Sequence, residues 1–113
     1  MDDWEKSEKR SVDLYGRKTP GSGSLDEKLD LQGLNAYSGL MGENKFTSKE
    51  SRSIKKEELR KAERQAYQMG CYFFFIVDFQ LKYRYIMCSE NYWIQIHEEL
   101  EELRKSNEKN KHS

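Results

Sequence analysis

The chain has 113 residues, which suits one small domain with a single modest core. Apolar and charged residues each make up 35% of it and the formal net charge is zero, so we expect a compact core under a heavily charged surface. No apolar run is long enough to span a bilayer and the first residues do not look like a signal peptide, so we expect a cytoplasmic protein with no membrane partner.

The first 24 residues predict a helix followed by a loop. Asp2 or Asp3 can cap a helix that runs to about Tyr15, and Gly16 is a suitable residue to end it. The segment 16–24, GRKTPGSGS, contains the only proline and several glycines. We therefore predict a loop there.

The middle of the chain predicts strands on either side of a second helix. Alternating or continuous apolar residues indicate strands, and a narrow apolar stripe at helical spacing indicates the helix. Ser53 is a plausible cap for this helix, and Gly70 is a plausible terminator. The predicted strands are 28–33, 37–48, 71–79 and 81–89.

The last predicted helix, 91–109, has its apolar residues on one face. We expect this face to cover the sheet, although dimerisation through it is an open alternative. From about Asn107 the chain is polar, so the predicted organisation is a single domain, 1–106, and a flexible tail, 107–113. The expected fold class is α/β, with a central mixed four-stranded sheet flanked by helices in the order αββαββα. The apolar face consists of Trp93, Ile96, Leu100 and Leu103.

The side chains that most often carry nucleophilic or zinc chemistry are sparse in this chain. Its two histidines, His97 and His112, lie near the C-terminus, away from the two cysteines, Cys71 and Cys88. We expect both cysteines to be reduced and buried. The sequence also lacks a Walker-type phosphate loop and a dinucleotide-binding glycine motif. The remaining candidates for a catalytic role are the carboxylate side chains of Asp and Glu.

Three residues of the predicted strands could carry that chemistry. Glu43 and Lys45 are two positions apart on one strand and therefore project on the same face. Asp30 lies on the preceding strand, from which its carboxylate could join that of Glu43 on a hard cation such as Mg²⁺. Such an ion activates phosphoryl groups and water, and a neighbouring lysine stabilises negative charge. The pattern predicts a site for phosphodiester cleavage, but the spacing alone also fits a solvated strand with an ion pair.

Positive charge is concentrated just after this trio, although the chain is neutral overall. Residues 44–65 include eight Lys or Arg and four Glu. Basic side chains at the start of a helix oppose the helix dipole, so phosphate binding would explain their placement better than solubility alone. The hydroxyl groups of Thr47 and Ser48 could add phosphate contacts. The basic candidates for DNA binding are Arg17, Lys18, Lys49, Arg52 and Lys55.

Taken in chain order, these motifs resemble a known family of nucleases. The motifs are EKRSVDLYGRKTPGSGS, LDL, ENKFTS and ELRKAERQAYQMGCYFFFIVDF, all within residues 5–87. Their order is similar to that of small phage-type nucleases of the PD-(D/E)-x-K superfamily, including Holliday-junction resolvase-like proteins. The resemblance implies a restriction-endonuclease-like core and Mg²⁺- or Mn²⁺-dependent DNA cleavage. It also implies a setting in junction resolution or in phage recombination and repair, in a bacterial or phage-infected cell.

The resemblance further implies a role for each matching residue. Asp30 and Glu43 would hold the metal ion, together with the backbone carbonyl of Asn44, and Lys45 would be the catalytic lysine. Glu8 would be the acid on the N-terminal helix. Further contacts to the metal site or the DNA would come from Ser22, Ser24 and Gln65.

Two assignments and the activity itself stay open at this level. Glu5 could replace Glu8, and Asp26 could replace Asp30, because Asp30 follows a lysine and a leucine where the family commonly has glycine or proline. An inactive relative would keep the fold, so the alternative function is a non-catalytic DNA-binding or regulatory protein. The expected partners are branched or duplex DNA and, for cleavage of two strands, a second copy of the chain.

Overall fold

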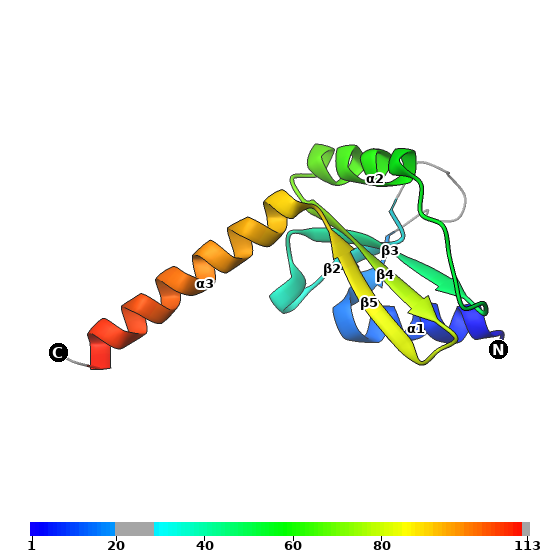
Figure 1. Cartoon of the computed structure of the whole chain (residues 1–113), viewed down its shortest axis with the longest axis horizontal. Coiled ribbons are helices and arrows are strands. Elements are labelled where there is room, and N and C mark those ends of the chain that lie inside the picture. The colour runs from blue at the N-terminus through cyan, green and yellow to red at the C-terminus, as the bar shows by residue number, and fades with distance from the viewer. Residues whose placement is uncertain (20–28, 112–113) are drawn as a thin grey trace.

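The computed structural model of the chain describes residues 1–19 and 29–111. It has a mixed α/β fold in which a five-stranded sheet lies between helices α1 and α2, and helix α3 projects from one end (Figure 1). The elements are α1 Asp3–Tyr15, β1 Gly16–Lys18, β2 Leu31–Gly33, the 3₁₀ turn η1 Asn35–Tyr37, β3 Leu40–Thr47, α2 Lys56–Gln68, β4 Tyr72–Phe79, β5 Tyr83–Cys88 and α3 Glu90–Lys111.

The strands lie in the sheet in their chain order, β1-β2-β3-β4-β5. Neighbouring strands are antiparallel except β3 and β4, which run parallel along their full length and are connected through α2. Strand β2 is short, and within β3 it pairs with Met41 and Gly42 alone. Among the described residues, the rest of β3, from Glu43 to Thr47, therefore has no strand partner on the side away from β4.

The sheet has a buried apolar layer on each face, which explains the continuous apolar run of β4. Helix α2 covers one face through Ala62 and Ala66, and α1 packs on the other through Val12 and Tyr15. Phe74 and Ile76 of β4 face α1, whereas its alternate residues face α2. The α2-facing residues of the sheet are Met41, Phe73, Phe75 and Val77.

Several local predictions are confirmed. Helix α1 begins after Asp2, whose backbone N–H donates to Glu5 Oε1, and Gly16 ends it. Gly70 follows α2 with a φ of 69°, the left-handed conformation that favours glycine after a helix. The cap of α2 is Lys55, however, and not Ser53, so this helix starts later than predicted.

The predicted number of strands is wrong, because the sheet has five strands and not four. The additional strand, β1, lies at the start of the predicted loop and pairs with β2, Gly16 opposite Gly33. A Cβ at Gly16 would collide with the backbone carbonyl of Gln32, so glycine allows the two chains to approach here. Strand β1 is polar and mostly exposed, and therefore has no hydrophobic pattern to reveal it.

The prediction that the last helix covers the sheet is also wrong. Helix α3 leaves the domain after β5, and α1 and α2 already occupy the two faces of the sheet (Figure 1). Its first turns touch the domain through Tyr92, which stacks on Tyr72 with ring centroids 4.6 Å apart, and through Gln95, which bonds to the Tyr72 hydroxyl. Helix α3 extends to Lys111, so the polar segment after Asn107 is helical that far.

Both cysteines are free and partly buried. Within residues 1–19 and 29–111, no helix is long and apolar enough to cross a membrane.

Candidate functional site

Glu43 and Lys45 lie on the α2-facing side of β3, as their spacing predicts. The Lys45 ammonium is 2.7 Å from Glu43 Oε2 and 3.6 Å from Oε1 of Glu58, which comes from α2. It also lies 5.2 Å from the centre of the Phe75 ring. Lys45 and Glu43 are 16% and 24% exposed, so this lysine is held in a largely enclosed setting next to a carboxylate.

The chain before β2 brings Asp30 beside Glu43. Leu31 pairs with Gly42 in the antiparallel ladder, so continuing the register by one residue sets Asp30 opposite Glu43. The Asp30 carbonyl accepts a hydrogen bond from the Thr19 N–H at 2.8 Å, which anchors this segment just beyond the end of β1. Two acidic side chains from neighbouring chain segments therefore share one corner of the sheet.

The electrostatics of Asp30 show that a third carboxylate lies near this corner. Burial raises the pKa of Asp30 to about 6, and the negative charges of Glu43 and Glu8 add to the rise. Lys45 and Lys18 act in the opposite direction but only partly offset it. We call Glu8, Asp30 and Glu43 the acidic cluster. Its members come from α1, from the segment before β2 and from β3.

The two candidate acids on α1, Glu8 and Glu5, have different partners. Glu8 Oε1 lies 2.9 Å from Lys18 Nζ, and its hydrogen bond and charge raise the pKa of Lys18. The Glu5 carboxylate instead accepts the backbone N–H of Asp2 at the start of α1. Glu8, unlike Glu5, is also among the charges that raise the pKa of Asp30.

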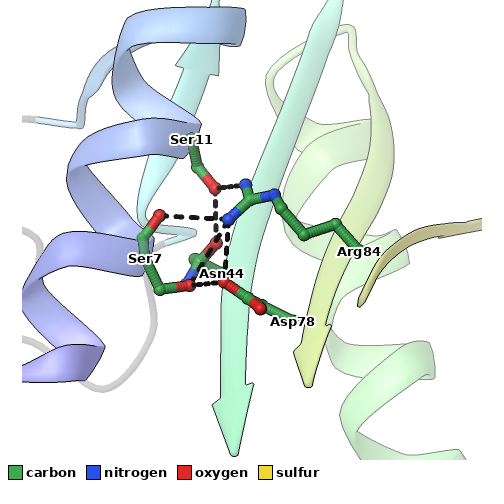
Figure 2. A network of polar contacts seen from close by, with 5 residues as sticks. All are labelled: Ser7, Ser11, Asn44, Asp78 and Arg84. Carbon is green, nitrogen blue, oxygen red and sulfur yellow. Dashed lines mark hydrogen bonds and ion pairs between the residues drawn. The ribbon is translucent and has the colours of Figure 1, made fainter. Parts of the chain in front are cut away.

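The side chain of Asn44 points away from the acidic cluster, to the α1 side of the sheet. There it joins a buried polar network of five residues (Figure 2). Asn44 Nδ2 donates to Ser7 Oγ at 2.8 Å, Asn44 Oδ1 accepts from Ser11, and Ser7 donates to Asp78 Oδ2. The Arg84 guanidinium pairs with Asp78 Oδ2 at 2.9 Å and donates to Ser11. The network ties α1 to β3, β4 and β5.

The sequence signal for this polar network is an acid within an otherwise apolar strand. Asp78 is fully buried at the end of an otherwise apolar strand, and a buried carboxylate needs a partner. The hairpin register sets Arg84 directly opposite Asp78. Ser7 and Ser11, both fully buried, are one helical turn apart on α1 and present hydroxyl groups to the pair.

The predicted DNA-binding residues near α2 are spread over the turn between β3 and that helix. Lys49, Arg52 and Lys55 are exposed there, and Arg52 Nη1 donates to the Phe46 carbonyl at 3.0 Å. The Thr47 hydroxyl accepts the Lys49 N–H at 3.1 Å and helps to shape this turn. Exposed Ser48 accepts a hydrogen bond through its carbonyl from Gln80.

The other predicted contacts fall into two groups. Gln65 lines a shallow cavity of about 190 Å³ beside Glu43 and Lys45, so the structure brings it next to the candidate site. Arg17 and Lys18 lie on the exposed edge strand β1, where Arg17 bonds to Gln32 and Lys18 to Glu8. The candidates Ser22, Ser24 and Asp26 lie outside the described residues.

The carboxylate oxygens of the acidic cluster are the donor type that hard cations such as Mg²⁺ take. Within the described ranges, no three His, Cys, Asp or Glu side chains are grouped closely enough to hold a metal ion by themselves. Mg²⁺, however, is commonly held by only one or two carboxylates and keeps its remaining places for water and substrate phosphate. Asp30 and Glu43 fit that requirement, because their mutual repulsion is relieved by a cation between them.

Comparison of the chain with models of protein families, with curated proteins and with solved structures finds no match.

Proposed function

We propose that this protein is a Mg²⁺- or Mn²⁺-dependent DNA endonuclease with a restriction-endonuclease-like core of the PD-(D/E)-x-K type. The observation that carries the proposal is the meeting of Asp30 and Glu43 at one corner of the sheet, with Lys45 held beside Glu43. The resemblance of the motifs predicts the same three residues. The parallel β3–α2–β4 unit, which carries Glu43 and Lys45, supports the core assignment.

In this proposal Asp30 and Glu43 hold the cation, and the backbone carbonyl of Asn44 is a further ligand by resemblance. A bound divalent cation supplies Lewis-acid polarisation of a phosphoryl oxygen. Burial raises the pKa of Asp30, and the negative charges of Glu43 and Glu8 add to the rise, so a cation would relieve an unfavourable arrangement. Glu8 adds negative charge from α1 and keeps Lys18 close by.

Lys45 is the group best placed to act on the scissile phosphate. Glu43 and Glu58 hold its ammonium on the same face as the acidic cluster, and the Phe75 ring supports it from the sheet. A fixed ammonium at this place would stabilise the negative charge that develops on phosphate oxygens during hydrolysis. Gln65, across the same cavity, offers an amide that can bond to phosphate or water.

The exposed basic turn before α2 offers a surface for the DNA backbone. Lys49, Arg52 and Lys55 follow directly after the strand that carries Glu43 and Lys45. Lysine and arginine contacts to phosphates release counterions, so DNA binding here would weaken steeply with added salt. The uneven distribution of charge also explains how a chain of zero net charge could bind a polyanion. Branched DNA, in recombination or repair, is the substrate class that the resemblance favours.

The proposal is tested by incubating the protein with a four-way junction, a linear duplex and single-stranded DNA, each in Mg²⁺ and in Mn²⁺. We expect cleavage of at least one substrate that stops on chelation and falls at least about 100-fold in Glu43→Gln and in Lys45→Met. Glu63→Gln on the exposed side of α2 is the matched control and should cleave normally. Binding without cleavage on every substrate would instead favour the non-catalytic DNA-binding function, and cleavage that survives both substitutions would reject this site.

A further inference from the structure

Helix α3 packs against the rest of the described chain only through its first turns. It extends over 22 residues, and beyond its first turns it projects away from the sheet (Figure 1). Apolar side chains along it remain open to solvent: Trp93 is 58% exposed and Leu103 is 62% exposed. Most helix stability in proteins comes from the packing of an apolar face rather than from helix propensity. Beyond the first turns, the apolar face of α3 therefore has no packing partner among the described residues.

The apolar residues of α3 follow a seven-residue repeat. Trp93, Ile96, Leu100 and Leu103 are separated by three, four and three positions, which places them alternately at the a and d positions of two heptads. Asn107 follows at the next a position. A polar asparagine at a single a position is a known device for fixing register and two-stranded assembly. This spacing suits the seam of a left-handed coiled coil.

The charges that flank this repeat identify the partner. Glu99 occupies a g position and Arg104 occupies the e position of the following heptad. In a parallel pair of identical helices, the g residue of one heptad lies beside the e residue of the next heptad on the other helix. Glu99 of each copy would therefore lie beside Arg104 of the other copy, which gives two such contacts. In an antiparallel pair g positions face g positions and e positions face e positions, so Glu99 would not meet Arg104. The charge pattern therefore favours a second, parallel copy.

We propose that α3 forms a parallel, two-stranded coiled coil with α3 of a second copy of this chain. Trp93, Ile96, Leu100 and Leu103 form the seam, and Glu99 pairs with Arg104 of the other copy across it. The arrangement has twofold symmetry about an axis along the helices, as most homodimers do. It places two sheet domains at the same end of the pair. The inference stands on α3 alone and does not depend on the proposed nuclease function.

The first test is the mass of the intact protein in solution, measured by sedimentation equilibrium or light scattering. We expect twice the chain mass of 13.5 kDa at tens of micromolar. Leu100→Lys with Leu103→Lys should give the monomer, with a dissociation constant raised at least about 100-fold. The matched control is Glu98→Gln with Glu102→Gln, which changes the net charge equally but lies outside the seam, and it should stay dimeric. A monomeric wild-type chain, or a dimer that survives the leucine substitutions, would overturn the proposal.

A charge swap tests the parallel direction. Glu99→Arg alone and Arg104→Glu alone each oppose like charges twice, and each should weaken the dimer by about tenfold. The combined Glu99→Arg/Arg104→Glu variant should restore wild-type affinity. A combined variant no tighter than either single one would reject the parallel pairing. Because these residues are exposed and distant from the sheet, circular dichroism and the thermal midpoint of the diluted protein verify that the domain itself stays folded.

Discussion

The side-chain nitrogen of Asn44 lies 2.8 Å from the Ser7 hydroxyl and donates a hydrogen bond to it. Asn44 stands between Glu43 and Lys45, and its side chain points to the opposite face of the sheet. The contact therefore fixes the part of β3 that carries the candidate site against α1, the helix that carries Glu8. The residue that looks least informative in the Glu-x-Lys motif is the one that ties it to the rest of the domain.

Asn44→Leu should destabilise the fold by about 1–3 kcal/mol. The substitution removes one donor and one acceptor from a buried network and leaves the hydroxyls of Ser7 and Ser11 with fewer partners. Urea unfolding measures the change as a lower midpoint. The same replacement at the exposed Asn91, on α3, is the control and should shift stability by less than about 0.5 kcal/mol. Equal effects at both positions would contradict a structural role for the network.

Arg84→Met should cost about 3–5 kcal/mol, because it leaves the fully buried Asp78 carboxylate without its cation. The combined Asp78→Leu/Arg84→Met variant should lose less than the single one, since no buried charge remains. Arg60→Met removes an exposed arginine that is 3.2 Å from Glu63 and should cost under about 1 kcal/mol. Thermal or urea unfolding of the three variants measures these differences. A double variant at least as destabilised as Arg84→Met alone would contradict the coupling.

Asp30→Asn should stabilise the metal-free protein at neutral pH. Because the folded pKa is about 6 and the ordinary value is 3.8, ionised Asp30 destabilises the fold as pH rises from about 4 to 6, and the penalty is complete above that range. The variant should gain about 1 kcal/mol at pH 7, a value reduced for partial solvent exposure, and nothing below about pH 4. Urea midpoints across this pH range measure it. Asp13→Asn, on the exposed side of α1, serves as the control.

Gly42→Ala should destabilise β3 next to the candidate site. An added Cβ at residue 42 would lie 2.6 Å from both the Phe74 carbonyl oxygen and its ring, so the β3–β4 pair would have to separate. We expect a loss of about 1–3 kcal/mol, seen as a lower thermal midpoint. Unchanged stability would mean that these strands lie further apart than described. The glycine that weakens the strand pattern in the sequence is thus explained by close packing.

The sequence predicts best those features in which one local pattern is decisive. The unbroken apolar run of β4 requires burial on both faces, and Asp2, Gly16 and Gly70 sit at helix ends that their chemistry favours. Asp30 and Glu43 could be paired in advance because their strands are neighbours in the chain. These predictions need no knowledge of how distant elements pack.

The remaining features depend on tertiary contacts that no local pattern contains. Strand β1 is polar and forms because β2 offers it an edge. An apolar helix face is the same whether it covers a sheet or binds another copy, so the direction of α3 could not be read from Trp93 and Leu103. The polar network joins Ser7 to Asp78 across 71 positions of the chain.

The central claim is that Asp30 and Glu43 together hold a divalent cation, and its most direct test does not require the right DNA substrate. Isothermal titration of the full chain with Mn²⁺ measures the number of sites and their affinity. We predict one site per chain, weakened at least about tenfold in Asp30→Asn and in Glu43→Gln, and weakened as pH falls below about 6 because protons compete for Asp30. Absence of Mn²⁺ binding by the wild type, or binding unchanged in both variants, would contradict the account.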